Sequence, residues 1–89
     1  MISLGEVSYH CTMEYGWMVI YDKVYDVTEY LERGRHPGGE DVMIEYLGYD
    51  ATMAFRGVGH SRGVSRVLEK YLVGILPRNE RLGLAADIL

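Results

Sequence analysis

The chain has 89 residues, of which 48% are hydrophobic and 25% are charged, and its formal net charge is −4. This length suits one domain with one core, and the composition predicts a folded chain. The acidic balance argues against a nucleic-acid partner, and no apolar run approaches the roughly 20 residues that cross a bilayer. Cys11 is the only cysteine, so an internal disulfide is excluded and a bound prosthetic group is the expected aid to stability.

The first half of the chain has the sequence pattern of β-strands. Residues 17–21 and 24–27 are rich in β-branched and aromatic side chains, and the pair Asp22–Lys23 between them suits a tight hairpin. Thr28 can then cap a short helix over residues 29–32.

The second half has helical spacing. Acidic residues from Glu40 onward open a first helix that Gly48 ends, because acids suit the positive end of a helix and glycine its terminus. Asp50 caps a second helix over residues 51–55, and Ser61 caps a third that runs to about residue 72.

Residues 72–76 return as a strand that Pro77 ends. We therefore expect one domain over residues 1–77 and a weakly attached C-terminal tail over residues 78–89, in which Leu82, Leu84, Ile88 and Leu89 are the side chains that could pack against the domain. The predicted fold class is α+β, a small mixed β-sheet with a basket of short helices on one side.

His36 lies in a constrained loop. Pro37 disfavours helical geometry at His36, and Gly38 and Gly39 permit a sharp turn and a close approach by a bulky group. Taken alone, such a histidine is more often a plain surface residue.

His60 lies 24 positions after His36, between glycines and the third predicted helix. Alone, it too is more often a surface loop residue. Two short apolar helices separate the histidines. A helix–turn–helix segment brings its two ends close together, so both histidines can face one apolar slot. Two imidazoles across such a slot, with no thiolate, suit a haem better than a bare metal ion.

The motif His36-Pro37-Gly38-Gly39, followed at this interval by Gly59-His60-Ser61, resembles the cytochrome b5 family. Similar residues occur elsewhere in the chain at Trp17, 23–28, Glu40, Gly48, 50–52, Phe55 and Gly74, so the resemblance covers most of residues 6–81. It implies a cytochrome b5-like fold whose helices form a haem pocket.

The resemblance also implies a set of site residues. His36 and His60 match the two axial ligands of a haem b (iron protoporphyrin IX). The pocket residues that it implies are Tyr30, Met43, Phe55, Val58 and Leu68, and Ser61 matches a position that reaches a haem propionate.

Two features depart from the family pattern. Gly34 and Arg35 make the segment before His36 about two residues longer than in the common microsomal form. The acidic rim is also diluted, since Arg56 stands where acids are common, so weaker steering towards a basic partner is expected.

The function implied is a one-electron carrier rather than an enzyme, because two protein ligands leave the iron no open position. The implied partners are a flavin-containing NAD(P)H-dependent reductase and an acceptor oxidase, desaturase or hydroxylase. A monomer in the cytoplasm is expected, at the cytosolic face of a membrane if an anchor or fusion partner lies outside this sequence.

Two rival functions stay open. One is a haem-binding interaction or sensor module that passes no electrons. The other is an enzyme that uses His36, Glu40 and Asp41 as acid–base groups, although the sequence offers no oxyanion motif, activated nucleophile or phosphate loop.

Overall fold

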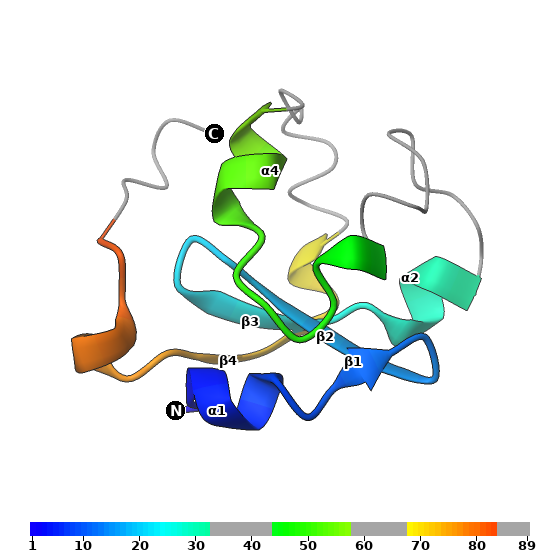
Figure 1. Ribbon diagram of the computed structural model, residues 1–89, viewed down its shortest axis with the longest axis horizontal. Helices are drawn as coiled ribbons and strands as arrows, with labels where there is room; N and C mark the ends of the chain where they lie inside the picture. The colour runs from blue at the N-terminus through cyan, green and yellow to red at the C-terminus, as the bar shows by residue number, and fades with distance from the viewer. Residues whose placement is uncertain (33–43, 58–67, 84–89) are drawn as a thin grey trace.

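The computed structural model describes residues 1–32, 44–57 and 68–83 of the chain (Figure 1). Residues 44–45 and 68–69 are helical and border the gaps. The remaining elements, in chain order, are α1 (Leu4–Val7), β1 (Cys11–Thr12), β2 (Tyr15–Ile20), β3 (Lys23–Asp26), α2 (Thr28–Glu32), α4 (Thr52–Gly57), β4 (Leu72–Ile75) and a 3-10 helix (Arg78–Glu80). No helix within these described ranges is long and apolar enough to span a bilayer.

The four strands form one sheet in the order β1-β2-β3-β4, with antiparallel pairing between neighbours. One isolated parallel bridge joins Val19 to Asp50 at the entrance to α4. The predicted α+β class is confirmed, and in the described part of the sheet this bridge supplies the only parallel pairing.

The β2–β3 hairpin turns one residue earlier than predicted. Ile20 pairs with Lys23, so the two turn residues are Tyr21 and Asp22, at φ 51° and 66°. Positive φ at both positions matches the hairpin turn whose twist fits the flanking strands. A tyrosine rarely adopts this geometry, so the sequence favoured the wrong pair. Here its side chain is buried and Thr52 Oγ1 accepts a hydrogen bond from its amide at 2.9 Å.

Two apolar clusters flank the sheet. Helices α2 and α4 lie on one side of it and α1 on the other (Figure 1). The larger cluster, called the upper core here, is formed by Met18, Ile20, Tyr21, Val27, Tyr30, Leu31, Leu47, Ala51, Phe55 and Leu68. The smaller cluster, the lower core, is formed by Val7, Val19, Val24 and Leu76 between the sheet and α1. Alternation of side chains along β2 and β3 sends successive residues to opposite cores.

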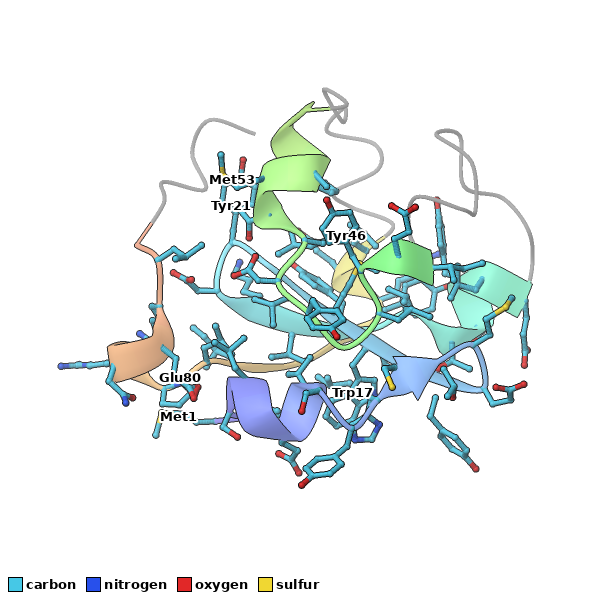
Figure 2. All side chains as sticks on the ribbon, in the orientation of Figure 1. Met1, Trp17, Tyr21, Tyr46, Met53 and Glu80 are labelled. Carbon is cyan, nitrogen blue, oxygen red and sulfur yellow. The ribbon has the colours of Figure 1, made fainter. Side chains whose placement is uncertain are left out.

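Helix α1 was not predicted, because four residues give no helical periodicity. Its signal is local: Ser3 Oγ accepts a hydrogen bond from the amide of Glu6 at 3.1 Å. A serine followed three residues later by a glutamate is the sequence pattern of a capping box. Figure 2 places Trp17 beside this helix, and the Trp17 side chain packs against the lower core.

The weak attachment expected for the tail is wrong for residues 78–83. The carboxylate of Asp22 accepts hydrogen bonds from the amides of Leu82 and Gly83, at 2.9 and 3.1 Å. Glu80 Oε2 accepts a hydrogen bond from the amide of Leu4 at 2.9 Å, and Arg81 Nε donates to the carbonyl of Leu76 at 2.7 Å. Polar side chains therefore hold this segment, and an apolar pattern could not have revealed it.

Candidate functional site

Three of the eight predicted site residues lie in the described part of the chain. Tyr30, Phe55 and Leu68 come from α2, α4 and the helical residues before β4, respectively. The other predicted positions lie outside the described residues; they are His36, Met43, Val58, His60 and Ser61.

The three described residues meet in the upper core. Their side chains are 7%, 6% and 5% exposed for Tyr30, Phe55 and Leu68. Phe55 meets the ring of Tyr21 edge to face at a centroid distance of 6.3 Å, and Tyr30 meets Tyr71 in the same way at 6.0 Å. Residues far apart in the sequence thus build one apolar wall on the α2–α4 side of the sheet.

A short polar network sets the start of α2. Asp26 Oδ1 accepts hydrogen bonds from the amide of Thr28 at 3.0 Å and from its hydroxyl at 2.7 Å. Thr28 Oγ1 in turn accepts one from the amide of Gly16 at 2.9 Å, which ties the helix to β2. Thr28 was expected to cap the helix, but it is the first residue of α2, and its own amide is capped by Asp26. Helix α2 ends at Glu32, four residues before His36.

The start of α4 is fixed in a similar way to that of α2. The expected cap at Asp50 is confirmed, since its Oδ1 accepts a hydrogen bond from the amide of Thr52 at 2.9 Å. The segment is pinned to β2 because Val19 exchanges backbone bonds with Tyr49 and Ala51, at 3.0 and 2.7 Å. Helix α4 ends at Gly57, three residues before His60.

Thr52 is a positioning residue that the sequence reasoning missed. Its side chain is 1% exposed and joins α4 to the β2–β3 turn through the amide of Tyr21. A signal was present in the sequence, because an aspartate stands two residues before a threonine at both helix starts, Asp26-Val27-Thr28 and Asp50-Ala51-Thr52. In each copy the aspartate accepts a hydrogen bond from the threonine amide.

The upper core is apolar and carries no formal charge among its described members. Burial, and after it the neighbouring Tyr71, raises the pKa of the Tyr30 phenol above 10.0, so this side chain stays neutral at ordinary pH. An uncharged wall of aromatic and aliphatic side chains is the surface that a flat macrocycle needs, so these residues fit a haem.

His10, the third histidine, belongs to the opposite side of the sheet. Its ring stacks on Trp17 at a centroid distance of 3.6 Å and an interplanar angle of 6°, and Trp17 packs on the lower core. This histidine is therefore separated from Tyr30 and Phe55 by the sheet, and it serves as a natural control for the two predicted ligands.

Comparison with known proteins points to one family. A family model described as "Cytochrome b5-like Heme/Steroid binding domain" matches residues 3–77. Cytochrome b5 of Rhizopus stolonifer is 46% identical over 81 residues, which are 91% of this chain and 60% of the relative. Cytochrome b5 of Drosophila melanogaster is 44% identical over 81 residues, which are 91% of this chain and 59% of the relative. The chain thus spans about 60% of the length of these relatives.

Solved structures agree with this result. Cytochrome b5 of Ostreococcus tauri virus 2 superposes with a TM-score of 0.75 at 33% identity, covering 88% of this chain and 98% of that one. Cytochrome b558 of Ectothiorhodospira vacuolata, described as a prokaryotic homologue of cytochrome b5, also gives a TM-score of 0.75, at 35% identity over 84% of this chain and 95% of that one.

Proposed function

The chain belongs to the cytochrome b5 family, and from this membership we propose that it is a one-electron carrier that holds one haem b between His36 and His60. The family model and the named relatives support haem binding and electron transport at this level. The ligand pair, the type of haem and the partners are the finer parts of the proposal.

The observation that carries the proposal is the convergence of Tyr30, Phe55 and Leu68 on one apolar wall. The family resemblance implied all three as haem contacts. Their segments border the ranges that hold the two histidines, because α2 ends at residue 32, α4 ends at residue 57 and Leu68 follows residue 67. The two helices that lead towards His36 and His60 are both fixed to the sheet, through Thr28 and Thr52. Rigid supports of this kind suit a pair of ligands that must keep their positions.

In this proposal His36 and His60 would be the residues that hold the haem iron. His36 and His60 would each give one imidazole nitrogen to the iron and donate the other N–H to a backbone carbonyl, which fixes the ring. Met43 and Val58 would extend the apolar wall, and Ser61 would donate to a propionate. The haem supplies a one-electron couple when it is bound. With both histidines bound to the iron, the chain would offer no open metal site for a substrate, and we propose no enzymatic role.

We propose a flavin-containing NAD(P)H-dependent reductase as the donor, and an oxidase, desaturase or hydroxylase as the acceptor. The chain spans only part of its curated relatives, so an anchor or a fused enzyme in the whole protein is compatible with this proposal. Residues 1–77 would form the haem-binding domain, as a monomer in the cytoplasm or at the cytosolic face of a membrane. Residues 78–83 would remain packed against it through Asp22.

The test is reduction of the haem-loaded chain by a purified NADH-dependent flavin reductase, followed by stopped-flow absorbance. The proposal predicts rapid reduction and rapid reoxidation by an added ferric c-type cytochrome. Dithionite serves as the control that the haem can be reduced at all. A chain that dithionite reduces but the flavoenzyme leaves ferric would favour the rival haem-binding sensor or interaction module.

A further inference from the structure

A hollow of about 530 Å³ lies between α2 and β4 on the flank of the domain. Its lining includes three carboxylates, those of Asp26, Glu29 and Glu32, and one ammonium group, that of Lys70. Three negative charges and one positive charge leave a formal charge of −2. Its volume is within the range of protein binding sites, about 300–1,000 Å³.

The outer edge of β4 borders this hollow. The amide of Leu76 donates to the carbonyl of Asp22 at 2.9 Å, and the carbonyl of Tyr71 accepts from the amide of Asp26 at 2.8 Å. The backbone groups of Leu76 and Tyr71 therefore face β3. Antiparallel strands alternate between inward and outward backbone groups, and the register shift opposite Tyr25 places two β4 residues, 72 and 73, against one of β3. The carbonyl of Ile75 faces the outer side, where it accepts the amide of Ile2, so the alternation turns the backbone groups of Val73, two residues away, towards the same outer edge.

That edge is only partly covered within the described ranges. The amide of Ile2 donates to the carbonyl of Ile75 at 2.9 Å, so the N-terminal segment caps one end of β4. No backbone bond between described residues reaches the outer side of Val73. The side chains of Leu72 and Val73 are 47% and 45% exposed, although both are apolar. An exposed strand edge with apolar side chains is a surface to which another extended chain can pair.

The charges beside this edge favour a basic occupant. Glu29 and Glu32 are both exposed and stand three positions apart in α2, which puts them on neighbouring parts of one helical face. Both line the hollow together with Leu72 and Val73. A net negative surface repels nucleic acid and anionic lipid, whereas it attracts lysine and arginine side chains.

We propose that the hollow and the open edge of β4 dock an extended segment of a partner protein, one that alternates apolar residues with lysine or arginine. Its backbone would pair with residues 72–73, its apolar side chains would cover Leu72 and Val73, and its cations would face Glu29 and Glu32. The short strand and its bulge limit indiscriminate pairing, so the side chains give the selectivity.

This surface goes beyond the proposed haem site and does not require it. The two are physically close, because Tyr71 lines the hollow and contacts Tyr30 of the upper core at 6.0 Å between ring centroids. A partner docked here would sit one aromatic side chain away from the proposed haem wall.

The test is a titration of the ¹⁵N-labelled, haem-loaded chain with a capped lysine–valine–lysine–valine–lysine peptide, followed by NMR. The proposal predicts saturable shifts of the amides of Glu32, Leu72 and Val73. It also predicts loss of these shifts when the peptide is N-methylated on its pairing edge, and when glutamate replaces its lysines. Because strand pairing requires the peptide amides, N-methylation isolates that contribution without altering the protein.

The double variant Glu29→Gln/Glu32→Gln should weaken peptide binding about threefold to tenfold, the loss expected for two exposed ion pairs. The matched control, Glu6→Gln/Glu14→Gln, removes two exposed carboxylates elsewhere and should bind the peptide as the parent chain does. Equal binding of the N-methylated peptide, shifts centred on Glu45 and Asp50, or no saturable shift would each overturn the proposal. So would a response of the same amides to anionic vesicles but not to the peptide.

Discussion

Replacing Thr52 with valine should destabilise the domain and release the amide of Tyr21. The two side chains have nearly the same shape, but valine cannot accept the hydrogen bond that Thr52 Oγ1 accepts at 2.9 Å. The Thr52 side chain is 1% exposed. Tyr21 is one of the two turn residues, and its amide points away from the hydrogen bonds that pair β2 with β3. Water therefore cannot readily replace the lost acceptor.

The expected cost follows from leaving one buried N–H group without a partner, about 1–3 kcal/mol. No cavity forms, so we expect a loss near the middle of that range, about 2 kcal/mol. In a domain of this size each kcal/mol lowers the midpoint of thermal unfolding by roughly 4–8 °C, which gives a decrease of about 8–16 °C. Thr52→Ser keeps the hydroxyl and loses only a methyl group, at about 1 kcal/mol.

Urea unfolding of the haem-free chain measures the free energy of unfolding of each variant. Amide hydrogen exchange then separates loss of the hydrogen bond to the Tyr21 amide from loss of the methyl group. Exchange at Tyr21 should become much faster in Thr52→Val and stay close to the parent rate in Thr52→Ser. If the valine variant is as stable as the parent, or if its Tyr21 amide stays protected, the assigned role of Thr52 is refuted.

Three further changes test other parts of the fold. Asp22→Asn keeps a residue suited to positive φ and one acceptor oxygen, but it replaces the second oxygen with an NH2 group that cannot accept. One of the two tail amides therefore loses its partner, so urea unfolding should show a loss of about 1 kcal/mol, and amide exchange should become faster at Leu82 or Gly83; unchanged exchange at both would contradict the tail contact. Gly48→Ala should lower the free energy of unfolding by at least about 2 kcal/mol in the same assay, because Gly48 has φ 86° and a new Cβ would lie 2.9 Å from Cys11 Cβ. A variant as stable as the parent would refute this steric role of Gly48. The raised pKa of Tyr30 means that the folded state holds this proton more tightly, so stability is full below about pH 10 and falls above it. Tyr30→Phe should weaken the dependence of stability on pH above about pH 10, and an identical alkaline titration of both chains would be inconsistent with a raised pKa of Tyr30.

The order of β2, β3, α2, α4 and β4 could be predicted because each has a local signal. Alternating β-branched and aromatic residues mark β2 and β3, and Asp50 and Gly48 mark the ends of helices. The hairpin turn was misplaced by one residue because the preference against positive φ at Tyr21 is local, whereas the contact that overrides it comes from Thr52, 31 positions away. Long-range polar contacts of this kind leave little trace in hydrophobic periodicity.

The site and the tail differ in how much of each could be predicted. Tyr30, Phe55 and Leu68 were identified through family motifs, and their common burial agrees with that assignment. The attachment of residues 78–83 was missed because it depends on carboxylates rather than apolar side chains. The placement of His36 and His60 stays a prediction, since both lie outside the described residues.

The most direct test of the central claim is the visible absorption spectrum of the haem-loaded chain, oxidised and reduced, beside His36→Ala, His60→Ala and His10→Phe. The last variant removes the third imidazole but keeps a ring that can stack on Trp17. Ligation of the iron by His36 and His60 predicts a six-coordinate low-spin spectrum that does not respond to carbon monoxide, is lost in each of the two alanine variants and is kept in His10→Phe. A high-spin spectrum that binds carbon monoxide, or a spectrum unchanged by either alanine substitution, would contradict it.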